Sequence, residues 1–160
     1  MTINDFITRL VAEIEIILKD VSFVDYQGKQ ASIKGYPYEL PFHPVSVGWD
    51  PEREEPDREL AVFPYFLVQI DEIEYEEESA VAKVWILLAA RDENMEMTGW
   101  KNVTVAVERL VNRFRSNPVL HDYYYCERKM KVAYPEASSW PQFFTGIEMQ
   151  WNLPDVKAEL

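Results

Sequence analysis

The chain has 160 residues and a net charge of −12, and 48% of its residues are hydrophobic and 14% aromatic. This much apolar material predicts one folded domain with its own core and excludes intrinsic disorder. The charge excludes general binding to the nucleic-acid backbone, which needs many Lys and Arg side chains, and the single cysteine excludes an internal disulfide and a cysteine-based zinc cluster.

No membrane span and no targeting segment are expected. The longest apolar run covers about seven residues, 84–90, whereas a membrane helix needs roughly 20. The first residues, Met1 to Asp5, carry no basic region and no signal-peptide pattern. We therefore expect the chain to be made in and to reside in a cytoplasm.

Residues 2–19 are predicted to form an amphipathic helix. Thr2 can cap its start, and Asp5 suits the positive end of the helix dipole. Apolar residues recur at helical spacing: Ile3, Ile7, Leu10, Val11, Ile14, Ile17 and Leu18. A short strand and a turn at Gln27–Lys29 follow within residues 20–33.

Residues 35–60 are predicted to form an extended arm. Prolines cluster there, and proline breaks helices and strand ladders. Aromatic and apolar side chains, among them Tyr38, Phe42, Val45 and Trp49, keep the segment from being a polar linker. The arm covers either its own core or a neighbouring subunit. The predicted organisation is one domain over residues 1–154, including this arm, and a loose tail at 155–160.

A long hairpin at residues 63–92 is predicted to form the centre of the sheet. Its strands span 63–73 and 80–90, and an acidic turn at 71–78 joins them. Alternation predicts one apolar face on the second strand and a mixed face that includes Trp85 and Leu87. A half-exposed apolar face is typical of an oligomer interface. The turn lacks the spaced ligands and the glycine of a calcium loop, so a solvated tip is the better interpretation.

The remaining chain predicts a helix over 100–115, a strand over 121–134 and a strand over 143–151. The apolar residues of the helix recur at spacings of three and four: Trp100, Val103, Val107, Leu110, Val111 and Phe114. The last strand alternates as a half-buried antiparallel strand does. The expected fold class is α+β, with an antiparallel sheet and both helices packed on one of its faces.

No catalytic pattern stands out, and we expect no enzyme, no cofactor and no metal. His121 and Cys126 are five residues apart, so a regular strand would point them to opposite faces. Glu148 is more simply paired with a cross-strand lysine such as Lys131 than used as a catalytic acid. Aromatic residues near the end could form a stacking platform for a sugar or base, or pack in the core and interfaces: Tyr123, Tyr124, Tyr125, Trp140, Phe143 and Phe144.

The order of elements, together with the ending from Trp140 to Trp151, resembles the tail terminator, or tail completion, family of tailed bacteriophages and prophages. The resemblance covers most of the chain and lies in architecture and length. It implies an α+β fold, no catalytic residues, and a hexameric ring. Such a ring caps the tail tube, stops its polymerisation and joins the tail to the head.

The same resemblance implies roles for particular surfaces. The arm and the mixed sheet face are expected to form the subunit interface. The hairpin tip is expected to line an acidic lumen, through which DNA passes without sticking. The expected interface residues are Tyr38, Phe42, Val45, Trp49, Trp85 and Leu87, and the expected lumen residues are Glu76, Glu77 and Glu78.

The expected partners are other copies of the chain, a tail-tube protein and a head-tail connector protein, with DNA only as passing cargo and no membrane. The expected location is the virion tail, after assembly in the host cytoplasm. Two alternatives stay open. One is another phage head-tail connector, neck or tail-tube-like protein, and the other is a cellular protein-binding module.

Overall fold

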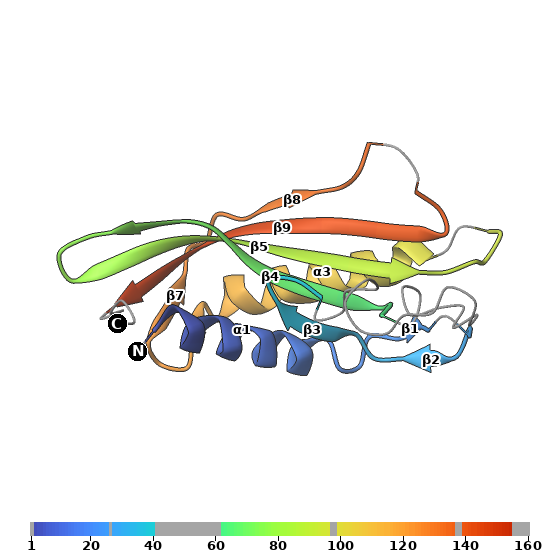
Figure 1. The fold of residues 1–160 in the computed structure, drawn as a ribbon, viewed down its shortest axis with the longest axis horizontal. Helices are drawn as coiled ribbons and strands as arrows, with labels where there is room; N and C mark the ends of the chain where they lie inside the picture. The colour runs from blue at the N-terminus through green and yellow to red at the C-terminus, as the bar shows by residue number, and fades with distance from the viewer. Residues whose placement is uncertain (1, 26, 41–61, 97–98, 137–138, 155–160) are drawn as a thin grey trace, which may run out of the picture.

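A computed structural model describes residues 2–25, 27–40, 62–96, 99–136 and 139–154 (Figure 1). Two long helices and a sheet built around three long strands make up this part of the chain. The helices are α1 (Ile3–Ile17) and α3 (Gly99–Ser116). The strands are β1 (Phe23–Val24), β2 (Gln30–Ala31), β3 (Lys34–Pro37), β4 (Tyr65–Tyr75), β5 (Ser79–Arg91), β6 (Val119–Leu120), β7 (Tyr124–Cys126), β8 (Lys131–Ala133) and β9 (Gln142–Pro154). The predicted α+β class is confirmed.

Helix α1 begins with a capping box. The Asp5 backbone N–H donates to the Thr2 Oγ1 at 3.2 Å, and the Thr2 backbone N–H donates to the Asp5 Oδ2 at 3.0 Å. These bonds satisfy two backbone donors that a helix start leaves without partners. The same hydrogen bonds hold the pKa of Asp5 below its ordinary value.

Removing this cap destabilises the fold. We expect Thr2→Ala to lower the free energy of unfolding by about 1 kcal/mol, the usual cost of losing a hydroxyl N-cap. Thr2→Ser keeps the hydroxyl and should stay close to the original chain. Urea unfolding followed by circular dichroism measures both variants. Equal losses in the two would show that the hydroxyl does not cap the helix.

The main sheet has the order β3-β4-β5-β9-β7-β6 in the described residues, and β8 also pairs with β9. β5 and β9 pair antiparallel along their whole lengths, from Ser79 opposite Pro154 to Arg91 opposite Gln142. The β4–β5 hairpin is the central hairpin that the sequence predicted, and β9 pairs with the other edge of β5. The β1–β2 pair forms a separate small ribbon.

The sheet is not antiparallel throughout, because β3 runs parallel to β4. Two strands can run the same way only when a long connection brings the chain back. Residues 38–64 supply that connection here. The arm predicted to begin at Gly35 therefore begins as an edge strand of the sheet, while residues 41–61 lie outside the described part.

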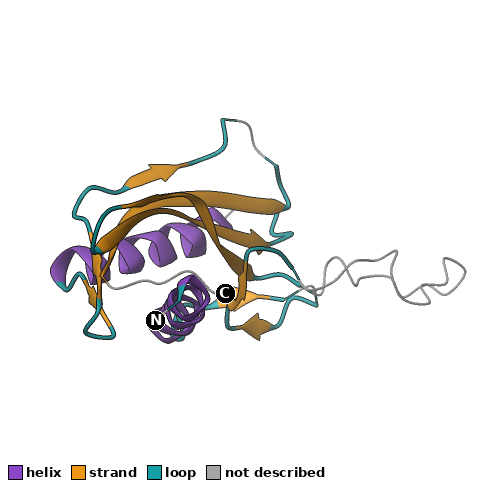
Figure 2. Ribbon diagram, turned by 60° about the vertical axis from the view of Figure 1, so that its left-hand side comes forward, coloured by secondary structure: helices purple, strands orange, loops and turns teal. Residues whose placement is uncertain are grey.

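Both helices pack on the inner face of the sheet, which curves over them (Figure 2). Every inward side chain in the middle of β5 is fully buried: Ala82, Val84, Ile86 and Leu88. α1 contributes Phe6 and Leu10 to the same core, and α3 contributes Leu110. The predicted packing of both helices on one face is confirmed. No helix in the described part of the chain is long and apolar enough to span a membrane.

Trp100 does not belong to the buried stripe of α3, so that part of the prediction is wrong. The buried positions of the helix are Gly99, Val103, Ala106, Val107, Leu110 and Phe114. A Cβ atom on Gly99 would lie 2.5 Å from the Phe143 ring, so the helix start lies directly against β9. With Gly99 facing inward, the next residue turns outward, and Trp100 is 52% exposed.

The predicted strand over 121–134 is also wrong, because two short strands, β7 and β8, replace it. His121 and Asp122 have φ values of 52° and 61° and form the turn between β6 and β7. Consecutive residues with positive φ are typical of tight hairpin turns, and Asp is among the residues that tolerate this conformation. After β7 the chain leaves the sheet and returns to it as β8.

Candidate functional site

The outer face of the sheet is the surface that the sequence predicted to be functional. β4, β5 and β9 present alternate residues there, and no helix of the described part covers it (Figure 2). Trp85 and Leu87 stand on this face, and both are half-buried. A Cβ atom on Gly146 would lie 3.2 Å from the Trp85 ring, so the indole lies close over the bare backbone of β9.

Tyr38 lies beside this face at the end of β3. Its backbone N–H donates to the Val68 carbonyl at 2.9 Å, and its carbonyl accepts from the Gln69 Nε2 at 2.8 Å. Gln69 pairs with Trp85 across the β4–β5 ladder, so β4 lies between Tyr38 and Trp85. The Tyr38 side chain is 42% exposed, and its φ is 62°.

A second apolar cluster occupies the same face near the start of β4. Its buried members are Phe63, Tyr65, Leu67 and Ala89, and Tyr36, Leu40, Val62, Leu87 and Phe144 pack against it while remaining half-buried. Burial raises the pKa of the Tyr65 phenol. Leu40 belongs to the arm and Val62 follows it, so the described residues on either side of 41–61 pack on the chain's own sheet. Phe42, Val45 and Trp49 lie outside the described residues.

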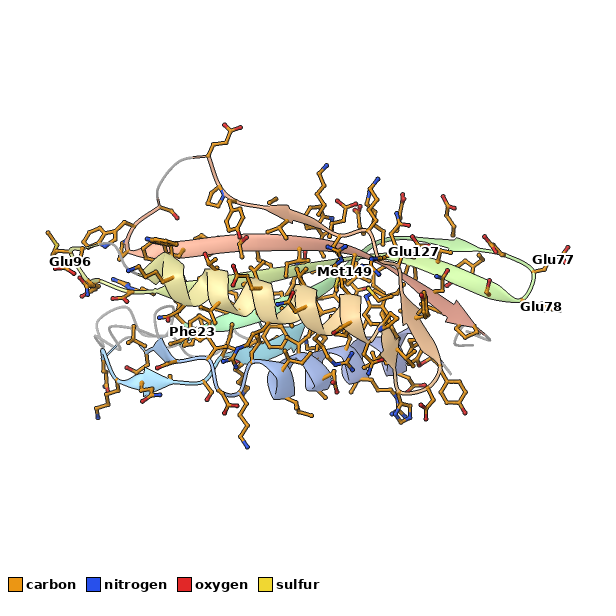
Figure 3. All side chains as sticks on the ribbon, turned by 180° about the vertical axis from the view of Figure 1, so that it is seen from behind. Phe23, Glu77, Glu78, Glu96, Glu127 and Met149 are labelled. Carbon is orange, nitrogen blue, oxygen red and sulfur yellow. The ribbon has the colours of Figure 1, made fainter. Side chains whose placement is uncertain are left out.

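The β4–β5 hairpin extends past the helices and carries the predicted acidic residues at its tip (Figures 1 and 3). Glu76, Glu77 and Glu78 are all exposed there. The Glu76 backbone N–H donates to the Ser79 carbonyl at 2.8 Å and closes the turn. A bulge at Asp71 breaks the register between β4 and β5. Bulges increase strand twist, so the tip is turned relative to the rest of the sheet.

One ion pair stands on the outer face between the apolar centre and the acidic tip. The Lys83 Nζ lies 3.1 Å from the Glu148 Oε1 and 3.8 Å from the Asp71 Oδ2. The hydrogen bond and charge of Glu148 raise the pKa of Lys83, so the pair contributes at neutral pH and is lost as pH rises through that raised value. The sequence suggested Lys131 as the partner of Glu148, but the ion pair is formed with Lys83.

The aromatic residues near the end of the sequence do not form one platform. Tyr124 is buried against Phe6, with ring centres 5.0 Å apart, whereas Phe143 and Phe144 lie at the far end of β9. The 13 residues of β9 span about 43 Å at 3.3 Å per residue, so its two ends are far apart. A single stacking site built from these residues is therefore excluded.

A cleft of about 420 Å³ lies between the start of α3 and the β8–β9 connection. The aromatic residues Trp100, Tyr134 and Phe143 line it, together with the carboxylates Glu96 and Glu136. The sequence did not predict this site, because its residues come from three separate segments. The exposed aromatic side chains were the only signal, and Trp100 was assigned to the core.

Cys126 and His121 do not form a catalytic pair. Cys126 is fully buried, and its Sγ donates to the Glu127 carbonyl at 3.4 Å, whereas His121 is exposed in the β6–β7 turn. Burial raises the pKa of the Cys126 thiol to about 12. Among the described residues, no group of three or more His, Cys, Asp or Glu side chains is placed to hold a metal ion.

The raised thiol pKa gives a direct test. At pH 8 a thiol with a pKa near 12 is ionised to thiolate about three orders of magnitude less than an ordinary cysteine thiol. The folded chain should therefore react with an aromatic disulfide reagent at least three orders of magnitude more slowly than the urea-unfolded chain. Because only the unfolded state ionises above pH 9, stability should fall by about 1.4 kcal/mol by pH 10. Cys126→Ala should lose this pH dependence. Equal reaction rates for the folded and unfolded chains would contradict the burial.

The chain was compared with protein-family models and with curated protein sequences, and neither comparison gives a match.

Proposed function

We propose that this chain is a tail terminator protein of a tailed bacteriophage or prophage. In this role it forms a ring, caps the tail tube and joins it to the head. The observation that carries the proposal is the outer sheet face, where Trp85 and Leu87 are half-buried and no helix of the described part covers them. The Tyr38 carbonyl accepts a hydrogen bond from Gln69, the cross-strand neighbour of Trp85, at the edge of this face. A half-exposed apolar face of this kind is typical of a subunit interface.

The acidic hairpin supports the same proposal. The hairpin tip with Glu77 and Glu78 extends past the helices, as a surface lining a shared passage would require (Figure 3). Glu76 is exposed in the same turn. A carboxylate-lined wall repels the phosphates of DNA, so DNA passes through without binding. In this proposal the partners are other copies of the chain, the tail-tube protein and a head-tail connector protein. The chain catalyses no reaction and needs no cofactor, and it works in the host cytoplasm during assembly and then in the virion tail.

The test is assembly followed by binding to tail tubes. Native mass spectrometry and electron microscopy of the purified chain should show a closed ring of about six copies, and the ring should bind the ends of tail tubes and stop their growth. Replacing Glu76, Glu77 and Glu78 by lysine should keep the ring and impair DNA passage and infectivity. Failure to bind tube ends would overturn the proposal, and open filaments would favour a tube-like protein.

A cellular protein-binding module is the second candidate, and the edge of β4 favours it. β3 covers only Tyr65–Val68, so residues 69–75 have a free edge in the described part of the chain. An extended peptide can add to such an edge as an extra strand. Two features of this edge count against the candidate. They are the bulge at Asp71 and the carboxylates of Glu72 and Glu74, because bulges and charges protect a sheet edge from pairing with another strand. A monomer that captures one stoichiometric partner would favour this candidate.

A further inference from the structure

The cleft at the start of α3 has the chemistry of a guanidinium-binding site. Trp100 and Tyr134, which are 52% and 56% exposed, line it together with the carboxylates Glu96 and Glu136. No Lys or Arg side chain is among its described lining residues. Lys101 of the same chain lies 5.9 Å from the centre of the Trp100 ring, so this ring already attracts a cation. A planar guanidinium stacks on aromatic rings and pairs with carboxylates at once.

The opposite end of α3 carries the complementary chemistry. A shallow hollow there is lined by Asn112, Arg115, Ser116 and Arg128. Both guanidinium groups are exposed, and neither forms an ion pair within the described part of the chain. The chain has a net charge of −12, so a surface with two exposed arginines differs from the acidic character of the chain as a whole. They attract an acidic surface.

The two surfaces lie at opposite ends of α3. Trp100 and Arg115 are 15 positions apart on α3, so about 22 Å separates them along the helix axis at a rise of 1.5 Å per residue. Figure 3 shows Glu96 at one end of the molecule and Glu127, the neighbour of Arg128, toward the other. One copy therefore cannot bring its own hollow to its own cleft, and contact between them needs a second copy.

We propose that the cleft of one copy binds the hollow of the next copy. Arg115 and Arg128 then pair with Glu96 and Glu136 and stack on the rings of Trp100 and Tyr134. A contact between two different surfaces is head-to-tail, and its repetition closes into a ring when the rotation fits. This contact rests on the proposed function, which requires a ring. It adds the two ends of α3 to the outer sheet face, which the cleft adjoins at Phe144.

Two charge-reversal variants test the contact. The cleft variant carries Glu96→Lys and Glu136→Lys, and the hollow variant carries Arg115→Glu and Arg128→Glu. Like charges then face each other, and each variant alone should associate about 100-fold more weakly than the original chain. An equimolar mixture should assemble again, because each cleft then meets a hollow of opposite charge. Sedimentation equilibrium and native mass spectrometry measure the association.

The controls separate charge from folding and the contact from the function. A variant with Lys19→Glu and Lys29→Glu changes the net charge as much as the hollow variant does, at exposed sites of another surface, and should assemble normally. The contact is overturned if either charge-reversal variant assembles normally, or if the equimolar mixture does not recover assembly. It is also overturned if the original chain stays monomeric at about 1 mM, because a contact with a millimolar dissociation constant is populated at that concentration. Recovery in the mixture without binding to tail tubes would keep the contact and overturn only the proposed function.

Discussion

Replacing Trp151 by alanine should lower the free energy of unfolding by about 3–5 kcal/mol, the usual range for a buried tryptophan or phenylalanine. Trp151 is fully buried on the inner face of β9. Its ring centre lies 5.5 Å from that of Phe6 on α1 and 5.2 Å from that of Phe114 on α3. Both helices therefore pack on this one indole, and its loss leaves a cavity where they meet the sheet.

The neighbours of Trp151 in the sheet explain why the cavity would stay open. Ala82 pairs with Trp151 on β5, and Cys126 pairs with it on β7. Both side chains are small and leave the room that the indole fills. Neither can expand into that room when the indole is removed, and rigid strands cannot close around it.

Two further variants make the test specific. Trp85→Ala removes the same side chain from the outer face, where it is half-buried, and should cost less than half as much. Trp151→Phe should cost less than about 2 kcal/mol, because it keeps a ring and removes an Nε1–H group that is buried without a hydrogen-bond partner in the described residues. Urea unfolding of the three variants measures these losses. Equal costs for Trp85→Ala and Trp151→Ala would contradict the assignment of the two faces.

Much of the fold could be predicted from the sequence because periodicity alone indicates it. The alternation along β5 identified the inner and outer faces, and the structure confirms them residue by residue from Ala82 to Leu88. The apolar spacing of α1 predicted its buried side, which includes Leu10 and Ile14. These signals are local, since each depends only on residues within one helix or strand.

The missed features depend on contacts between distant residues. Trp100 has the spacing of a core residue, and only the close approach of Gly99 to Phe143 turns it outward. The parallel pairing of β3 with β4 depends on how a long connection returns, which no local pattern records.

The cleft could not be predicted for the same reason. Glu96 and Glu136 are 40 positions apart in the sequence, and only the packing of α3 beside β9 brings them to one surface. The outer face was easier to predict from the sequence, because Trp85 and Leu87 belong to a single strand.

Gly35→Ala should be the most destabilising change that adds a single methyl group, with an expected loss of about 3 kcal/mol. Gly35 is buried on β3 and pairs with Phe66 on β4. A Cβ atom at this position would lie 2.1 Å from the Cζ of the Phe66 ring. Phe66 is fully buried, so its ring has no free space into which to move.

The backbone at Gly35 cannot move away either. Its N–H donates to the Glu15 Oε1 at 2.9 Å, which ties β3 to α1, and the parallel pairing ties the strand to β4. The added methyl group must therefore push β3 off the helix or off the sheet. Either displacement loses hydrogen bonds as well as packing.

Gly146→Ala is the matched control for this change. Its Cβ atom would lie 3.2 Å from the half-buried Trp85 ring on the outer face, which has room to shift. We expect a change within about 1 kcal/mol, because alanine also restricts the unfolded chain and so offsets part of any clash. A large loss at Gly146 would show that the Trp85 ring is held as firmly as a core side chain.

A double-mutant cycle with Phe66→Leu shows whether the ring is the cause. Leucine lacks the ring tip that the new methyl group would meet, so the double variant should be more stable than the sum of the single losses by about 1–3 kcal/mol. Urea unfolding of the two single variants and the double variant gives this coupling energy. Additive losses would mean that Gly35 and Phe66 do not touch. The parallel register that sets Gly35 opposite Phe66 would then be wrong.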